Sequence, residues 1–366
     1  MKRSRGLDRL CLRPTDRIPH LEHFSNPRFE AFVTGIDPWA HPQRARQRFL
    51  ELLPIDVGAA PTSDAPLERL PDEALSFQEA DGTRLARWGT GRSWHWDWGK
   101  RFATLDAVLA HDPGSEQDLR GAGLVADLDY RLEVGELAAQ FQRELDEARA
   151  ATGERALVVP SFYNTLFMWP LLTFGWKNFL RLGARHPGET RRILAGFAER
   201  SRKVFQAWAK TDVEVFCSHD DICHQAGPTF APAWLREFIY PYYEEFWGCL
   251  RGAGVRLIFI CDGNLDEVAD DIFACGADGL MSEPYTDWER IARGHPDKVI
   301  MGDGDSRVLA SNDPPAIDRM VQKMAALGRR QPGYFFCIGN HLPWDLPVAA
   351  IAAYFAATEK HGCAAG

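Results

Sequence analysis

The chain has 366 residues, of which 45% are hydrophobic and 25% are charged, as is ordinary for a globular protein. Its formal net charge is -9, which argues against a nucleic-acid partner because such a surface needs a basic stripe. The sequence contains no run of roughly 18 apolar residues, no apolar signal segment and no CxxC pair among its eight cysteines. We therefore expect a cytoplasmic protein that does not enter a membrane.

The first 17 residues carry a basic cluster that consists of Lys2, Arg3, Arg5, Arg9, Arg13 and Arg17. Charge blocks of this kind are usually solvated, which favours an exposed N-terminal arm. The alternative is an arm that folds over the protein and meets an anionic ligand. Strand-like segments follow near residues 17 and 55, with a helical stretch at about 41–53 between them.

Residues from about 62 to 102 have a different pattern. Polar and apolar residues alternate there around Asp81-Gly82, and an Asp-Gly pair between alternating segments is the strongest short hairpin signal. We interpret this region as a β-rich insertion or lid.

Beyond residue 150 the sequence alternates between short apolar runs and helical stretches. Further strands are predicted near residues 155, 213, 255, 277, 298 and 333, which gives eight with the two nearer the N-terminus. Eight strands with helical crossovers predict a single-domain (β/α)8 TIM barrel over 1–366, with an N-terminal arm and the insertion. A doubly wound sheet is the runner-up, but no Gly-rich dinucleotide loop follows the first strand.

Polar side chains end most of these strands. Parallel strands all end on one side of a sheet, so these residues should converge on one rim, where α/β folds place their chemistry. The candidates for substrate binding, catalysis or metal binding are Glu22, Asp56, Asn164, His219, Asp220, Asp221, Asp262, Asn264, Glu283, Asp305 and His341.

The acidic pairs among these candidates suggest proton chemistry. Asp220 and Asp221 follow His219 directly, and like charges that share a poorly solvated site raise the pKa of one carboxyl group, which can then act as a general acid. Asp262 should point into the mouth of the barrel, whereas Asn264 could equally cap a following helix.

Glu22, His23 and Asp56, near the first two strands, are weaker candidates, and the later strand ends offer further ones. Glu283 precedes a proline that blocks further strand pairing, so packing explains this acid poorly. Asp303 and Asp305 alternate, and we favour Asp305 as the inward one. His219, His341 and the carboxylates could hold zinc or another divalent ion, although no clustered ligand motif is present, so a bound metal stays open.

These motifs, taken in order, resemble the uroporphyrinogen decarboxylase superfamily, which also contains corrinoid-linked methyltransferases. The matching pieces are Asp16-Arg17-Ile18-Pro19, Asp220-Asp221, Phe230-Ala-Pro232, Asp262-Gly263-Asn264, Glu283-Pro284, Gly302-Asp303-Gly304-Asp305 and Asn340-His341-Leu342-Pro343. The resemblance implies a (β/α)8 barrel with its site at the C-terminal strand ends. His341 matches a late histidine of the family, and Asp56 matches its early aspartate loosely.

Two departures from the family pattern bear on the reaction. Members that methylate thiols carry a His-x-Cys-Gly zinc motif, but this chain has Ile260 and Asp262 at those places, with Cys261 one position off. Porphyrinogen decarboxylases carry an Arg-rich motif after the first strand, where residues 22–26 read Glu-His-Phe-Ser-Asn.

The resemblance therefore suggests methyl transfer from a small methylated substrate to a corrinoid (cobalamin) on a partner protein. Because cobalt is the nucleophile in that chemistry, the enzyme must protonate the leaving heteroatom. Asp221, Asp262 and Glu283 are predicted as acid and orienting groups, with His219 and His341 as proton relay or metal ligands. Decarboxylation of a porphyrinogen-like or other carboxylated substrate and a non-catalytic ligand-binding barrel remain alternatives, and a homodimer is compatible with each.

Overall fold

The computed structural model describes residues 1–69, 76–78, 84–94, 102–114 and 128–363. A six-stranded sheet forms its centre, in the order β11-β10-β9-β8-β5-β4, and every neighbouring pair is parallel. The strands are β4 (Ser161–Phe162), β5 (Val215–His219), β8 (Arg256–Ile260), β9 (Gly279–Met281), β10 (Val299–Met301) and β11 (Gly333–Phe335).

Parallel bridges join the two edges of this sheet. His20 pairs with Phe336 after β11, Leu21 pairs with Val57, and Val57 pairs with Leu157 on the segment that leads into β4. The segments near residues 20 and 57 thus complete a ring of eight strand positions, all of them at places that the sequence predicts. The fold is the predicted (β/α)8 barrel rather than a doubly wound sheet.

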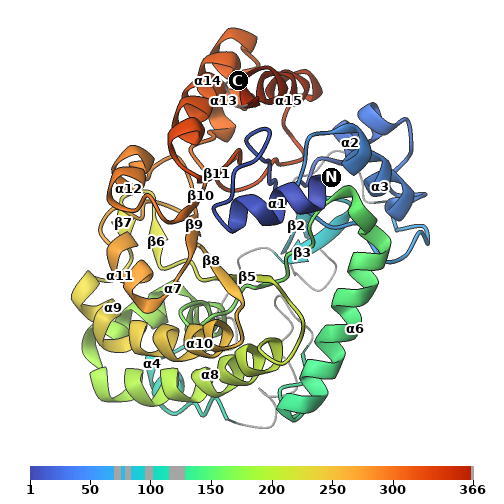
Figure 1. The fold of residues 1–366 in the computed structure, drawn as a ribbon. Coiled ribbons are helices and arrows are strands. Elements are labelled where there is room, and N and C mark those ends of the chain that lie inside the picture. The colour runs from blue at the N-terminus through green and yellow to red at the C-terminus, as the bar shows by residue number, and fades with distance from the viewer. Residues whose placement is uncertain (70–75, 79–83, 95–101, 115–127, 364–366) are drawn as a thin grey trace.

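Helices surround the barrel (Figure 1). They are α2 (Pro27–Thr34), α3 (Pro42–Leu52), α4 (Leu105–Leu109), α6 (Val134–Thr152), α7 (Met168–Arg185), α8 (Pro187–Trp208), α9 (Pro232–Phe238), α10 (Tyr240–Gly252), α11 (Ala269–Cys275), α12 (Trp288–Gly294), α13 (Ser306–Ala310), α14 (Pro314–Arg330) and α15 (Val348–Gly362). Proline opens several of them, including α9 and α14, because the first turn of a helix has no use for the missing N–H.

The N-terminal helix α1 (Lys2–Leu10) closes the base of the barrel, the end at which the strands begin. Its Leu10 packs into the interior cluster formed by inward-facing strand residues. The Arg9 guanidinium donates to the carbonyl oxygens of Gly328 and Gln331, just before β11. Figure 1 shows α1 lying across the middle of the molecule in front of the strands. The basic segment is thus neither a solvated arm nor a contact for a ligand at the rim, because its helix is anchored at the opposite end.

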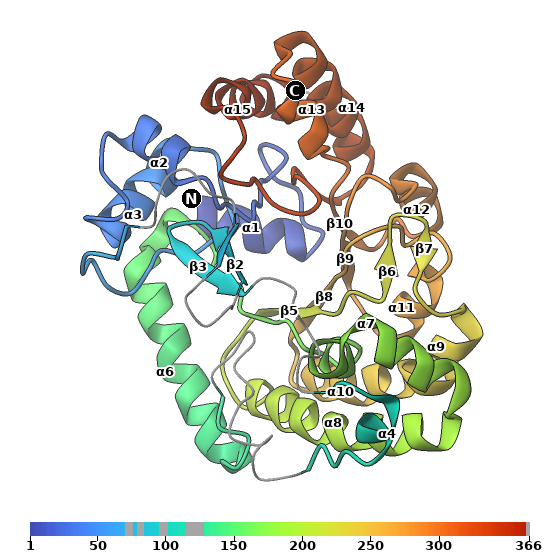
Figure 2. The ribbon, with the colours of Figure 1, turned by 180° about the vertical axis from the view of Figure 1, so that it is seen from behind.

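The described part of the region 62–102 contains a separate antiparallel sheet of β1 (Ser76–Gln78), β2 (Arg84–Trp88) and β3 (Gly91–Trp94). Phe77 pairs with Leu85 across the expected turn, whose Asp81 and Gly82 lie outside the described residues. This sheet is the predicted β-rich insertion, and β2 and β3 lie on the face seen in Figure 2, away from α1. Within the described ranges, no helix has both the length and the apolar character needed to cross a membrane.

Candidate active site at the barrel mouth

The alternation of side chains along each strand determines which residues enter the mouth, the end at which the strands finish. On β5, Val215 and Cys217 face the barrel interior, so His219 and Asp221 continue on the inner side. On β8, Ile258 and Ile260 face inward, and Asp262 follows them.

Asp221 is the centre of the arrangement. Its Oδ1 lies 3.0 Å from Nε2 of His219 and accepts the backbone N–H of Asp262 at 3.1 Å. Its Oδ2 accepts the hydroxyl of Tyr163 at 2.9 Å. His219, Asp221 and Asp262 each offer a ligand atom, and these atoms lie within 4.8 Å of one another.

Burial and charge set the protonation of this group. Burial, followed by the nearby Asp221 charge, raises the pKa of Asp262 to about 7. Burial also acts to raise the pKa of Asp221, but the charge of His219 and the hydrogen bonds outweigh it, so this pKa lies below its ordinary value. Burial acts to lower the pKa of His219, but the Asp221 charge, the hydrogen bond to Asp221 and the charges of Asp262 and Asp220 together outweigh it, so this pKa is raised. Near neutral pH Asp221 is therefore charged, whereas Asp262 is only about half ionised.

The strand ends of β9 and β11 complete the mouth. Glu283 accepts the backbone N–H of Gly263 at 2.8 Å, and the side-chain amide of Asn340 donates to Oδ2 of Asp262 at 3.3 Å. That donation fixes the orientation of Asn340, whose Oδ1 faces Nδ1 of His341 at 2.6 Å. Nδ1 of His341 must then carry the hydrogen, because an amide oxygen only accepts.

Two further imidazoles in the mouth are neutral. Burial lowers the pKa of His341 to about 4. Burial, followed by the charges of His219 and His341, lowers the pKa of His23 to about 4. We call the following residues the mouth cluster: His23, Tyr163, His219, Asp221, Asp262, Glu283, Asn340 and His341. As far as the structure describes this end of the barrel, the cluster includes no Arg or Lys.

Asp220 lies on the opposite side of β5 from its neighbour Asp221. Its carboxylate is fully buried and accepts the backbone N–H groups of Leu166, Phe167 and Met168 at 2.6–2.7 Å, at the start of α7. The Tyr243 hydroxyl donates to it at 2.7 Å. Burial raises the pKa of Asp220 to about 7. These contacts make it the cap of α7 in the helix layer.

Glu22 and Asp56 also point away from the mouth. Glu22 faces the helix layer, where it accepts from the Tyr354 hydroxyl at 2.6 Å and from the backbone N–H of Ile338 at 3.2 Å. Asp56 is buried towards the base and pairs with Arg5 at 2.7 Å.

Three other predicted residues make local contacts. Oδ1 of Asn264 accepts the backbone N–H of Asp266, which forms a turn rather than capping a helix at Leu265. Asp305 caps α13 and pairs with Arg307 at 2.8 Å. Asn164 is buried, and its Oδ1 has no hydrogen-bond partner among the described residues.

Sequence reasoning missed Tyr163 and ranked His23 low. The alternation places both once the structure shows that Leu157 and Leu21 face the interior, because Tyr163 and His23 then lie on the inner side and Asn164 and Glu22 on the outer side.

The donor set of the cluster suits a divalent ion bound by nitrogen and oxygen. One imidazole and two carboxylates are ligands that zinc and other divalent metals accept. Cys261, which precedes Asp262 in the chain, faces the helix layer, and its S–H group donates to the backbone oxygen of Asp262 at 3.1 Å. Among the described residues the mouth therefore offers no thiolate set.

A closed parallel barrel with acids and imidazoles at its C-terminal strand ends is the architecture of TIM-barrel enzymes. The uroporphyrinogen decarboxylase (URO-D) family model matches residues 173–361, slightly more than half of the chain. The chain belongs to the uroporphyrinogen decarboxylase family. Most of the mouth cluster lies within the matched residues, whereas His23 and Tyr163 precede them.

Solved structures agree with this fold. A methyltransferase from Methanosarcina mazei is 16% identical with a TM-score of 0.60, and the likeness covers 98% of both chains. A xylose isomerase-like TIM-barrel protein from Mycobacterium smegmatis in complex with magnesium is 14% identical (TM-score 0.34, 62% of this chain and 81% of that one). A D-psicose 3-epimerase from Clostridium cellulolyticum H10 is 10% identical (0.35, 62% and 90%). At these identities the first likeness supports the fold and the other two add nothing to it. A search of curated proteins gave no match.

Proposed function

We propose that this barrel transfers a methyl group from a small methylated substrate to a corrinoid carried by a partner protein. The observation that carries the proposal is the contact of Asp221 with Asp262, in which one carboxyl group is charged and its neighbour keeps its proton in part of the molecules near neutral pH. The full-length likeness of the fold to a methyltransferase supports the same choice.

Asp262 is the proton donor in this proposal. Its Oδ2 accepts from Asn340, so the acidic proton resides on Oδ1. When the methyl group leaves, the heteroatom of the substrate gains negative charge and takes this proton. General acid catalysis of this kind typically contributes a factor of about 10² to 10⁴ in rate.

The residues around Asp262 maintain its protonated state and orient it. Asp221 repels the charge that Asp262 would gain on ionising, and Asn340 fixes the direction of the carboxyl group. Glu283 holds the backbone of the next residue, Gly263. The corrinoid of the partner protein supplies the nucleophile that accepts the methyl group.

A divalent ion such as zinc is the second occupant that the cluster could take. His219, Asp221 and Asp262 would hold it through one nitrogen and two oxygens. A bound metal would supply positive charge that activates the substrate, but it would displace the proton from Asp262. Metal and proton are therefore competing states of one site, and elemental analysis of the purified protein distinguishes them.

Decarboxylation is the alternative that the family match itself favours. The composition of the mouth cluster argues against a polycarboxylate substrate, because three carboxylates face the barrel axis and no Arg or Lys belongs to the cluster as described. A porphyrinogen with several carboxylates would meet like charge there.

The experiment mixes the protein with reduced cobalamin and a panel of O-, N- and S-methylated small molecules. We expect at least one donor to change the visible spectrum of the cobalamin. Asp262→Asn should slow this reaction at least 100-fold, whereas Glu267→Gln, an exposed carboxylate in the same loop, should leave it unchanged.

Parallel assays separate the alternatives. Loss of carboxyl groups from uroporphyrinogen, with no cobalamin change for any donor, would establish decarboxylation instead. Affinity for a ligand without turnover in either assay would favour the binding barrel.

A further inference from the structure

Two tyrosine–aspartate pairs stand back to back at the end of β5. Tyr163 donates its hydroxyl to Asp221 at 2.9 Å on the mouth side, and Tyr243 donates to Asp220 at 2.7 Å on the helix side. The second pair belongs to the capping network of α7, which is a structural role. The first pair caps no helix among the described residues, and its contacts are with His219 and Asp262 in the mouth.

Tyr163 fixes the orientation of the Asp221 carboxylate. Because Oδ2 of Asp221 is occupied by the phenol, the carboxylate cannot turn without losing that bond. Oδ1 therefore faces His219 and the backbone N–H of Asp262, at 3.0 Å and 3.1 Å. One oxygen of Asp221 serves the cluster while the other anchors it.

The ring of Tyr163 also restrains His219. The two ring centroids lie 4.4 Å apart at an interplanar angle of 72°, an edge-to-face contact. A single residue thus contacts both members of the His219–Asp221 pair.

We propose that Tyr163 is a positioning residue of the mouth, which holds the Asp221 carboxylate through its hydroxyl and the His219 imidazole through its ring. The catalytic consequence of this role rests on the proposed methyl transfer, but the positioning itself does not. In this role Tyr163 acts through its contacts with Asp221 and His219.

The test compares Tyr163→Phe with the matched variant Tyr243→Phe. Each removes one hydroxyl from one aspartate at the same strand end. The readout is the imidazole N–H proton of His219 in NMR spectra of chelator-treated, metal-free protein, assigned by its loss in His219→Gln. In Tyr163→Phe we expect this proton to exchange with water about tenfold faster, the factor expected when a charged carboxylate loses one hydrogen bond and swings. In Tyr243→Phe the exchange should match the wild type.

An unchanged exchange rate in Tyr163→Phe would overturn the proposal, and so would equal acceleration in both variants, which would mean general loosening. If Tyr163→Phe fails to fold, the hydroxyl proton of Tyr163 in the wild-type protein replaces the His219 proton as the readout, assigned by its loss in Asp221→Asn. A slowly exchanging hydroxyl signal supports the anchoring bond, and a hydroxyl proton that exchanges as fast as that of free tyrosine would overturn the role.

Turnover provides an independent readout. If methyl transfer occurs, Tyr163→Phe should lower kcat about tenfold and leave KM for the methyl donor within about twofold, since misplaced catalytic groups slow chemistry more than they weaken binding. Faster exchange in a protein that transfers no methyl group would refute the proposed function and leave the positioning role intact. Methyl transfer with an unchanged exchange rate would refute the positioning role and leave the proposed function intact.

Discussion

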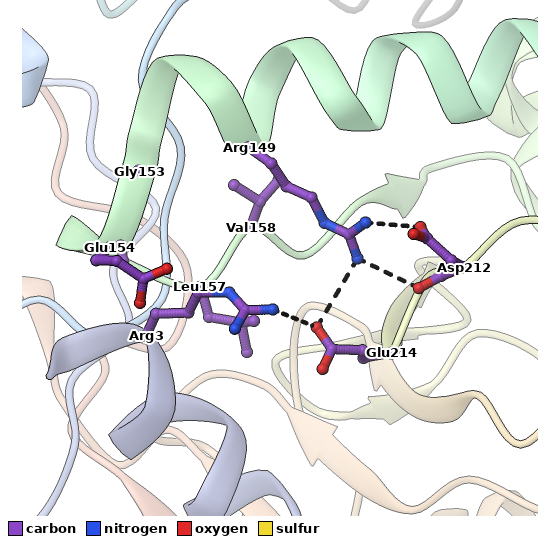
Figure 3. Close-up of a pocket in the computed structure, with 9 residues that line it drawn as sticks. Arg3, Arg149, Gly153, Glu154, Leu157, Val158, Asp212 and Glu214 are labelled. Atoms are coloured by element: carbon purple, nitrogen blue, oxygen red, sulfur yellow. Dashed lines mark hydrogen bonds and ion pairs between the residues drawn. The ribbon is translucent and has the colours of Figure 1, made fainter.

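Charged side chains gather at both ends of the barrel, but their partners differ. At the base, a cavity of about 510 Å³ is lined by Arg3, Arg149, Asp212 and Glu214 among others. Figure 3 shows Arg149 bonded to Asp212 and close to Glu214, which also pairs with Arg3 at 2.9 Å. In the mouth cluster, by contrast, the carboxylates meet imidazoles, an amide and a phenol.

The charged side chains at the base therefore stabilise the fold, whereas those at the mouth are suited to chemistry. Opposite charges in contact fix one another and keep ordinary protonation states, so the base holds the N-terminal helix in place. In the mouth, the charge of His219 helps to lower the pKa of Asp221, whereas burial and the Asp221 charge raise that of Asp262, and a carboxyl group with such a raised pKa can exchange a proton or bind a metal.

The largest effect should come from breaking the buried ion pair at the base. Asp56 is fully buried, and Arg5 lies 2.7 Å from it, with a second bond from the backbone N–H of His20. Arg5→Leu leaves this carboxyl group without its cation, and we expect the free energy of unfolding to fall by about 3–5 kcal/mol. Urea unfolding followed by circular dichroism measures it.

The exposed pair of Arg13 with Asp8 provides the control for that experiment. Both side chains are at least 40% exposed, so Arg13→Leu should change the stability little. A loss below about 1 kcal/mol for Arg5→Leu would mean that the base does not depend on charge pairing.

The next effect concerns chemistry at the mouth. Asp262→Asn keeps the shape of the side chain and removes its acidic proton, so methyl transfer should fall at least 100-fold, about 2.7 kcal/mol in barrier. Its stability should equal or exceed that of the wild type above pH 7, because the variant has no charge for Asp221 to repel. Activity within twofold of the wild type would exclude Asp262 as the acid.

The pH dependence of stability and of kcat tests the protonation of Asp262 at the mouth. The pKa of Asp262 is about 7 in the folded protein and near 4 when unfolded. The contribution of the Asp262 proton to stability is therefore complete below about pH 4 and is lost as the pH rises through about 7. The catalytic proton is lost over the upper part of the same pH range. We expect kcat to decline above pH 7 in the wild type.

The stability curve provides a separate check. Asp220 also has a pKa of about 7, so Asp262→Asn should lose only part of the decline in unfolding free energy between pH 5 and pH 8. A decline identical to that of the wild type would show that Asp262 does not hold its proton.

The alternation of side chains along each strand explains how far the sequence could predict this site. Apolar runs identify the strands, and therefore the barrel and the strand ends at Asp262, Glu283 and His341. They do not show which alternate residues face inward, which is why Glu22 and Asn164 were preferred to His23 and Tyr163. The catalytic and binding roles of the residues at these strand ends stay predictions.

Other placements depend on contacts between distant segments. Asp220 caps α7 only because residues 166–168 pack beside β5, more than 50 positions away in the chain. Leu10 likewise enters the barrel base only once the ring of strands exists. No local pattern around either residue contains that information.

The smallest effect should come from the exposed charges at the base. Arg149 bonds to Asp212 at 2.6 Å, but the Asp212 side chain is 65% exposed, so water competes for both charges. Arg149→Gln should therefore cost no more than about 1 kcal/mol of unfolding free energy, and less in 1 M salt, where exposed charges are screened within about 3 Å. A double-mutant cycle with Asp212→Asn isolates the pair. A coupling above about 2 kcal/mol would place these charges in the same class as Asp56, and the base would then depend on its ion pairs throughout.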